Sequence, residues 1–545
     1  MKQLISSFQL HKRSLLTLIL SGVFVWSLFS IKWNAELFHS GGGPIILQIL
    51  KGLIHPAMKA NLFSLGLQSA WITLAYAVAG MTFAILYAFV FGILASGILA
   101  SSKTARISTK VFFRGILGFT RSIHELVWAW MFVAAIGLSP YAAILAIAIP
   151  YGGILGRIFA DMLADVPEAP IKALKSAGAS RMQALFYGYL PLVRADMISY
   201  TMYRFECAIR SSAIMSFVGL GGLGYQIQLS LADLKYDEVW LFVYFLIALV
   251  LLVDMWSNVI RNGLTVSTSK KWFGSSSISS VLVIIMIFGS FGFIALGENA
   301  HLFDLLSKNN LEFTKKFFGG LIGLNNDRPA FLDLGSWMDA WKLSIETLQM
   351  SVMAIGFATI GAFLTVIPAA RNIANGTLTT SKTWYGWLLF GIVRVLYIFS
   401  RAIPELVWAM IIIFIFKPGI LPGAVALALH NFGILGKLWA EVIEDMDQRP
   451  IRNLASSGAS KAQSLFYGVI PAVMPKFLTY ILYRWEVIMR TTIVVGFVGA
   501  GGLGMQFKLS MSYFQYTELS LLLICYLILV AFADLASETA RKAVQ

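Results

Sequence analysis

Charged residues are scarce in this chain of 545 residues: only 13% are Asp, Glu, Lys or Arg, whereas 58% are apolar. Soluble proteins carry about 25% charged residues, so this composition excludes an ordinary soluble enzyme. The 42 basic residues outnumber the 27 acidic ones, but so apolar a chain can hardly display the wide basic surface that nucleic acids require. An excess of Lys and Arg on the inner loops of an integral membrane protein explains the imbalance.

Cysteine and the common catalytic motifs are equally rare. Cys207 and Cys525 both lie in apolar stretches, and they provide neither a disulfide framework nor a metal-ligand spacing. The sequence contains no HxxxH pair. Gly219-x-Gly221-x-x-Gly224 matches the dinucleotide fingerprint only formally, because no strand–helix–strand alternation surrounds it. We therefore expect no catalytic residue, no metal and no cofactor bound by this chain.

The chain contains an internal sequence repeat. The repeated segments, all at one constant offset, are Arg121–Ala129 with Arg401–Ala409, Ser176–Ser180 with Ser456–Ser460, and Asp254 with Asp534. A register that holds from Arg121 to Asp254 indicates an internal duplication. We predict a first repeat over residues 1–265, a second over 278–545, and between them a polar cytoplasmic linker at 266–277.

Each repeat can be threaded through a membrane by span length and loop charge. In the first half, the expected spans lie within Leu15–Ser30, Leu65–Ala100, Ile116–Gly137, Tyr141–Phe159, Asp196–Phe217 and Val239–Val259. Residues 31–61 form an outer segment, partly an amphipathic helix on the membrane surface. The prediction is an all-α integral membrane protein of about twelve transmembrane helices in two tandem six-helix halves, with both termini in the cytoplasm.

A long inner loop separates the fourth and fifth spans of each half, at about residues 161–191 and 441–471. About 30 residues are more than a simple turn between spans needs. Gly178 and Gly458 are placed to end one short helix, and the Ala-Ser that follows each glycine is placed to begin the next. The loop is thus predicted to be a helix–turn–helix suited to docking on a cytoplasmic partner, rather than a mere re-entry loop.

The residues of this loop resemble those of a known family. Gly178 with Pro191, and Gly458 with Pro471, are similar to the "EAA" loop of ABC-importer permeases, the segment that inserts into the ATPase subunit. The pattern LxSxGASxxQxLFYG resembles the phosphonate-type permeases in particular, as do YR-aromatic-ExxxR and FVGxGGLG. The similarity is weakest over residues 1–60 and 278–340. The resemblance implies two fused permease copies with a type I ABC importer-like fold.

The same resemblance implies partners and site residues. The residues that match the ATPase-coupling segment are Lys172, Ser176, Gly178, Ala179, Ser180, Pro191, Arg452, Ser456, Gly458, Ala459, Ser460 and Pro471. Lys172 and Arg452 depart from the family pattern, because a glutamate is expected six residues before the glycine. With no GxxxxGK[ST] phosphate loop in the chain, ATP and Mg are expected on a separate homodimeric ATPase.

The remaining partners also follow from the resemblance. A periplasmic or lipid-anchored binding protein would deliver the substrate, a phosphorus oxyanion of the phosphonate, phosphite or phosphate class. The chain would then be a permease subunit of an ATP-hydrolysing translocase in the bacterial inner membrane, in contact with lipid and not with nucleic acid.

Ionisable residues within the spans point to a pathway or gate. The candidates are Arg121, Glu125, Tyr203, Glu206, Arg210, Gly221, Gly222, Arg401, Glu405, Tyr483, Glu486, Arg490, Gly501 and Gly502. On a continuous helix, Tyr203, Glu206 and Arg210 share one face, and charge in hydrocarbon must be paired or face water. The arginines either attract an oxyanion or merely pair with Glu at i, i+4, and both readings stay open.

The third span repeats this pattern. Arg114, Arg121 and Glu125 are spaced to share one face, and Arg114 is expected to snorkel to the inner interface. Pro404, which stands where the first half has His124, predicts a kink in the second half alone.

A secondary transporter driven by an ion gradient is the alternative function, because two repeats of six spans also fit that class. Asp254 and Asp534 would then be candidate midplane carboxylates. Only the ABC importer hypothesis requires the paired inner loops.

Overall fold

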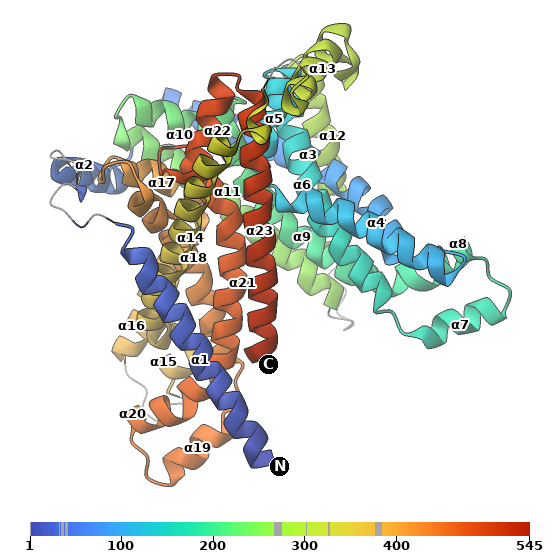
Figure 1. Ribbon diagram of the computed structural model, residues 1–545. Helices are drawn as coiled ribbons and strands as arrows, with labels where there is room; N and C mark the ends of the chain where they lie inside the picture. The colour runs from blue at the N-terminus through green and yellow to red at the C-terminus, as the bar shows by residue number, and fades with distance from the viewer. Residues whose placement is uncertain are drawn as a thin grey trace. The chain divides into compact units, whose positions relative to one another are not determined.

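The computed structural model describes residues 2–31, 33, 37–38, 42–265, 275–300, 302–324, 328–376 and 384–544. Within these residues the chain is helical, and no strand is present beyond one isolated bridge between Phe38 and Phe416 (Figure 1). Most of the predicted linker, residues 266–274, lies outside the described part. Contacts divide the chain into two compact units, residues 48–320 and residues 1–47 with 321–545.

The unit formed by residues 48–320 is built around two long helices. Its elements are α3 (Ala60–Ser96), α4 (Lys103–Ser122), α5 (Glu125–Ile136), α6 (Pro140–Ala164), α7 (Glu168–Ser176), α8 (Arg181–Ala184), η2 (Leu185–Tyr189), α9 (Leu190–Met215), η3 (Ser216–Val218), α10 (Leu223–Ala232), α11 (Tyr236–Thr265), α12 (Ser275–Gly292), η4 (Phe293–Gly297), η5 (Leu302–Leu306) and α13 (Lys308–Ile322). Small residues let α3 and α6 approach closely: a Cβ on Gly92 would lie 2.9 Å from the carbonyl oxygen of Gly156. Such contacts are typical of helix packing in membranes.

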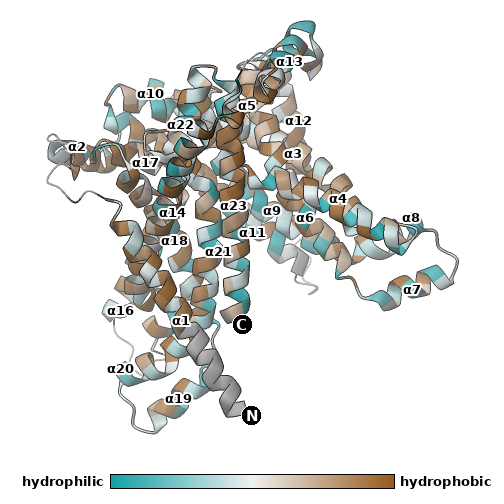
Figure 2. Ribbon diagram, viewed as in Figure 1, coloured by the Kyte–Doolittle hydropathy of each residue, from teal (hydrophilic) through white to brown (hydrophobic). Residues whose placement is uncertain are grey.

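The other unit repeats the plan. It contains α1 (Lys2–Leu28), η6 (Ala330–Leu332), α14 (Leu334–Ala369), α15 (Arg371–Ala374), α16 (Trp384–Ala402), α17 (Glu405–Ile413), α18 (Ile420–Glu444), α19 (Arg449–Ser456), α20 (Lys461–Gln463), η7 (Ser464–Val469), α21 (Ile470–Gly496), α22 (Gly502–Ser512) and α23 (Tyr516–Val544). The helix α2 (Gly42–Ile54) straddles the boundary between the units. In Figure 2 most of α23 is hydrophobic, and its C-terminal end is polar.

The first helix of each predicted repeat packs with the other repeat. Helix α1 contacts α14 and α23, and the rings of Phe24 and Phe357 meet edge to face at 5.6 Å. Helix α12 contacts α3, and Phe291 meets Phe83 in the same way at 5.7 Å. The compact units therefore differ from the sequence repeats by an exchange of first helices.

Length and composition support fewer certain spans than the predicted twelve. In the described residues, eight helices are long and apolar enough to cross a membrane, or nine if the bent pair formed by 181–218 and 223–232 is one span. Four shorter apolar helices add to these: Leu15–Leu28, Gly42–Ile54, Glu125–Ile136 and Val281–Gly297. The all-α membrane class is confirmed, whereas the count of twelve stays a prediction.

The predicted third span is wrong as a continuous helix. In the first half it breaks between α4 and α5, where Ile123 is extended and the His124 ring accepts a hydrogen bond from the Leu126 amide. In the second half it breaks between α16 and α17, where Pro404 precedes Glu405. The kink predicted for the second half alone therefore occurs in both halves. The His124 side chain caps the new helix in the first half, and Pro404 interrupts the helix in the second.

Candidate functional site

The two inner loops have the predicted helix–turn–helix form. Gly178 and Gly458 both have φ of +87°, the left-handed conformation that ends a helix at little cost only for glycine. Ser180 caps the next helix through a reciprocal capping box with Gln183, and Ser460 does the same with Gln463. The local geometry confirms the predicted turn, while its role in ATPase coupling stays a prediction.

After the turn, each loop continues through a π-helical stretch into the fifth span. The stretches are Leu185–Tyr189 and Ser464–Val469, and Pro191 and Pro471 stand in the first turn of the helices that follow. A Cβ on Gly188 would lie 2.8 Å from the side chains of Ile171 and Leu174, so α7 packs tightly there. Gly468 packs against Ile451 and Leu454 in the second loop in the same way.

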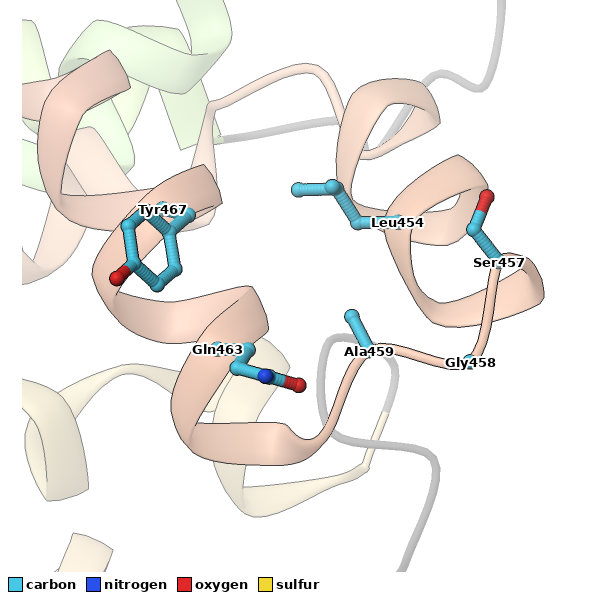
Figure 3. A pocket seen from close by; sticks show the side chains of 6 residues that line it. All are labelled: Leu454, Ser457, Gly458, Ala459, Gln463 and Tyr467. Atoms are coloured by element: carbon cyan, nitrogen blue, oxygen red, sulfur yellow. The ribbon is translucent and has the colours of Figure 1, made fainter.

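An open hollow of about 420 Å³ lies between α19 and the helix that follows the turn (Figure 3). Its lining residues are Leu454, Ser457, Gly458, Ala459, Gln463 and Tyr467. The residues at the matching positions of the first half are Leu174, Ala177, Gly178, Ala179, Gln183 and Tyr187, identical but for one. The aromatic side chains point outward, since Tyr187 is 76% exposed and Tyr467 is 77% exposed.

Cations stand where the family pattern has glutamate. Lys172 pairs with Glu168 one turn earlier, with Nζ 2.6 Å from Oε2. Hydrogen bonding to Lys172 lowers the pKa of the Glu168 carboxyl below its ordinary value. Arg452 instead donates to the amide oxygen of Gln448 at 2.9 Å. Both cations therefore have partners on their own helix or its cap, and only the first partner is a carboxylate.

The glycine-rich turn after the fifth span is bound to the second span of its half. The backbone NH of Leu223 donates to Thr73 Oγ1 at 3.0 Å, and the NH of Leu503 donates to Thr347 Oγ1 at 2.9 Å. A Cβ on Gly222 would lie 2.8 Å from Thr73 Oγ1.

The remaining glycines of the turn fit the same arrangement. Gly221 and Gly501 have φ of +77° and +79°, and a Cβ on Gly502 would lie 2.6 Å from Thr347 Oγ1. The two threonines are candidate site residues that sequence reasoning missed.

On the fifth span, the residues predicted to share one face differ in their exposure. Tyr203 and Tyr483 are 45% and 42% exposed, whereas Glu206 and Glu486 are buried. Arg210 Nη2 lies 3.7 Å from Cys207 Sγ.

The buried glutamates pair with arginines of the same unit. Glu486 pairs with Arg490 at 2.9 Å and with Arg541 at 3.2 Å, and Arg490 also reaches Asp534 at 2.7 Å. In the first half, Glu206 pairs with Arg261 at 3.0 Å. In the second half, the predicted i, i+4 ion pair therefore forms between Glu486 and Arg490.

The break in the third span places a glutamate at a helix start in each half. Glu125 begins α5, and Glu405 begins α17. Arg121 and Arg401 stay on the preceding helices, α4 and α16, so the predicted single face with Glu125 does not form.

Arg114 contacts the ends of two neighbouring helices, while its expected place at the inner membrane interface stays a prediction. It pairs with Asp161 at 2.9 Å and donates to the Ala95 carbonyl.

Each of these glutamates faces one histidine, but from different elements. His124 Nε2 lies 3.5 Å from Glu125, and His430 Nε2, on α18, lies 3.5 Å from Glu405. Pro404 occupies the position of His124, and Pro150 occupies the position of His430. Histidine and proline have therefore changed places between the halves, while the contact between glutamate and imidazole is present in both.

A family model places this chain among known proteins. The model of the binding-protein-dependent transport system inner membrane component matches residues 88–266 and again residues 372–545. Because the two matches cover more than half of the chain, the chain belongs to this family. The double match confirms the internal duplication and the fusion of two permease copies in one multi-pass membrane chain.

Individual relatives extend this comparison. The phosphate-import permease protein PhnE of Mycolicibacterium smegmatis is 28% identical over 466 residues, which are 85% of this chain and 82% of that protein. The phosphite transport system permease protein PtxC of Stutzerimonas stutzeri is 36% identical over 214 residues, or 39% of this chain and 73% of that protein. A solved structure of the MetNI methionine ABC transporter, in an inward-facing conformation, is 22% identical over 38% of this chain and 100% of its own, with a TM-score of 0.35.

Proposed function

We propose that this chain is the membrane permease of an ATP-driven importer that carries a phosphorus oxyanion. The observation that carries the proposal is the pair of inner loops with one geometry, which recur in register with the sequence duplication. Each loop offers an exposed turn and an outward aromatic side chain to one copy of a homodimeric ATPase, and the second loop also has a hollow there. An ion-driven secondary transporter has no use for two such loops.

Relatives named for phosphate and phosphite transport support the substrate class. The substrate would arrive from an external binding protein and be released to the cytoplasm as ATP binding and hydrolysis switch the halves between two states. In the importer, the glycine-rich turns and the α9 and α21 ion pairs would line or gate the path. Buried arginines attract anions strongly when a partner exchange frees them.

The test is reconstitution of the full chain in proteoliposomes with its co-purifying ATPase and the candidate binding protein. ATP hydrolysis is then measured with phosphonate, phosphite, hypophosphite or phosphate. Stimulation by one loaded binding protein would support the proposal and name the substrate. Uptake that follows a proton or sodium gradient, with no ATPase associated, would contradict it and favour the secondary transporter.

A further inference from the structure

We infer that the first half binds the headgroup of an anionic phospholipid at a basic cluster on α4. The cluster is formed by Lys103, Arg106, Lys110 and Arg114. In the second half only the last of these cations is kept, as Arg394, so the site is expected in one half alone. Such a site would exist whatever the transported substrate or the ATPase.

The basic residues on α4 and α6 far outnumber the acidic ones. The charged residues of these two helices are Lys103, Arg106, Lys110, Arg114, Arg121, Arg157 and Asp161. Those of the matching helices in the second half, α16 and α18, are Arg394, Arg401, Lys437, Glu441 and Glu444. The second half is therefore close to balanced, whereas the first half has a large excess of positive charge.

The ion pairs show the same difference between the halves. Asp161 is shared by two cations, with Oδ1 2.9 Å from Arg114 and Oδ2 3.1 Å from Arg157. In the second half each matching cation has a carboxylate of its own, in the pairs Arg394–Glu444 and Lys437–Glu441. Ala164 stands at the position of Glu444, so the first half lacks the carboxylate that would balance its second arginine.

The cations of α4 gather on one face of the helix. From Lys103 they follow one another at intervals of three or four residues, which brings side chains together on a helix. The stems of Arg106 and Lys110 pack on the turn after α3, because a Cβ on Gly97 would lie 3.0 Å from Cγ of each. Among the residues that the structure describes, Lys103, Arg106 and Lys110 form no ion pair. Like charges at this spacing repel one another, and an anion from outside the chain would relieve the repulsion.

Another cation borders the cluster from the inner loop. Arg181 on α8 donates to the carbonyl oxygens of Leu99 and Ser101, at 3.2 and 3.4 Å, in the turn between α3 and α4. These acceptors have no net charge, so Arg181 adds to the positive charge on this side of the unit. Glu168, the acidic residue of α7, already pairs with Lys172.

Exposed apolar side chains next to the cluster favour a lipid as the source of the anion. Ile107, Val111 and Phe112 of α4 are 54%, 69% and 63% exposed. Ile107 lies one turn from Lys103, and Val111 lies one turn further, so an apolar strip begins beside the cations. A phospholipid matches both parts, with a phosphate for the cations and acyl chains for the strip. A soluble anion or the polar surface of an ATPase would match the cations only.

Hydropathy separates α4 from α16 in the same way. Residues 385–402 of α16 are apolar enough to cross a membrane, whereas α4, although 20 residues long, is not. Hydrophobic and hydrophilic residues mix along α4 in Figure 2. Gly386 and Phe390 stand at the positions of Arg106 and Lys110. The start of α4 is therefore suited to the headgroup layer, and α16 to the hydrocarbon.

Native mass spectrometry of the delipidated full chain tests the site, by titration with phosphatidylglycerol and with phosphatidylcholine of the same acyl chains. We expect phosphatidylglycerol to bind more tightly, and R106Q with K110Q to weaken its binding about thirtyfold. The matched control is K315Q with K316Q, which removes two exposed cations of α13 and should leave the affinity unchanged. Equal binding of the two lipids, or an equal loss in both double variants, would overturn the inference.

Two further measurements separate the lipid from other occupants of the cluster. Inorganic phosphate or soluble glycerol phosphate in large excess should not displace phosphatidylglycerol, and displacement by either would replace the lipid site by a free-anion site. R106Q with K110Q, as monodisperse protein, should retain as much ATPase as the unchanged chain. Loss of the ATPase with unchanged lipid binding would assign the cluster to the ATPase and overturn the inference.

Photoactivatable phosphatidylglycerol compares the two halves directly. At trace amounts in phosphatidylcholine nanodiscs, it should label peptides of α4 more than peptides of α16. K110F, which copies Phe390 of the second half, should remove most of this excess, while K110R should keep it. Equal labelling of α4 and α16 in the unchanged chain would contradict the inference.

Discussion

The two halves agree closely at the inner loops and differ at the glutamates that begin α5 and α17. Gly178 and Gly458 share one φ. In the capping boxes, the Ser180 amide donates to Gln183 at 2.7 Å and the Ser460 amide donates to Gln463 at 2.8 Å. At Glu125 and Glu405, by contrast, the histidine comes from a different element in each half.

The difference shows which features of a duplicated chain are free to diverge. Under the proposed function, the two loops bind two copies of one ATPase and must present the same surface twice, so a change in one loop is not compensated by the other. A buried carboxylate needs a polar neighbour, and His124 or His430 can supply one from different elements of the two halves. Compensated exchange is therefore possible in the core but not at the docking surface.

The largest effect is expected when the shared turn is changed. Gly178→Val with Gly458→Val forces a β-branched residue to φ +87°, at about 1–2 kcal/mol per site, although the space around both glycines is open. We expect at least a tenfold loss of retained ATPase, and smaller losses for each single variant. The measurement is ATPase retained on the tagged full chain.

The matched control is Gly115→Val, a helical glycine of α4 that also has open space around it. It should leave retention unchanged. Full retention by the double variant would contradict the view that the left-handed turn shapes the docking surface.

The exchange of histidine and proline gives the next effect. His430→Pro alone removes the imidazole from Glu405, and we expect about a tenfold loss of stimulated ATP hydrolysis, since the loss of a polar partner at a buried carboxylate costs about 1–3 kcal/mol. His430→Pro with Pro404→His copies the arrangement of His124 and Pro150. This double variant should recover a large part of the activity.

Recovery is judged at equal amounts of monodisperse protein. If the double variant is as inactive as the single one, the two arrangements are not interchangeable and the comparison of the glutamate sites fails.

Loss of the helix caps should be smaller and equal in the two halves. Ser180→Ala and Ser460→Ala each remove a capping side chain, which costs about 1 kcal/mol. Hydrogen exchange at α8 and α20 should rise by about fivefold in each case. Unequal increases would show that the two loops differ in stability despite their common geometry.

The smallest effect concerns acid pH. Lys172 lowers the pKa of Glu168, so this pair stabilises the first loop at neutral pH, and the stabilisation is lost as the pH falls through the carboxyl's pKa. In the second loop, Gln448 stands in the place of Glu168 and has no ionisable group.

Because Glu168 and Lys172 are exposed, the change should be slight. Local hydrogen exchange in α7 should rise modestly in acid while α19 stays unchanged, and E168Q should abolish the difference. The same acid response in α19 would contradict this assignment.

The sequence alone predicted what depends on local chemistry. Helix ends at Gly178 and Gly458, the caps that follow, and the duplication all come from neighbouring residues or a fixed offset, and all are confirmed. The break before Glu125 was missed, because a histidine cap is not a recognised helix stop.

Long-range partners could not be predicted from residue patterns. The apolar composition of α1 predicts that the helix lies in lipid or protein. It does not predict that α14 and α23 are its neighbours. The contact of His430 with Glu405 joins α18 to the start of α17 and depends on how these helices pack. Thr73 and Thr347 likewise reveal their role only when the glycine turn lies beside them.

Native mass spectrometry of the purified complex tests the central claim most directly, because it counts ATPase subunits on each chain. Two paired loops predict one chain with two ATPase copies, and one copy after the turn of a single loop is disrupted. A chain that carries no ATPase, or that still carries two copies after Gly178→Val with Gly458→Val, would contradict the account.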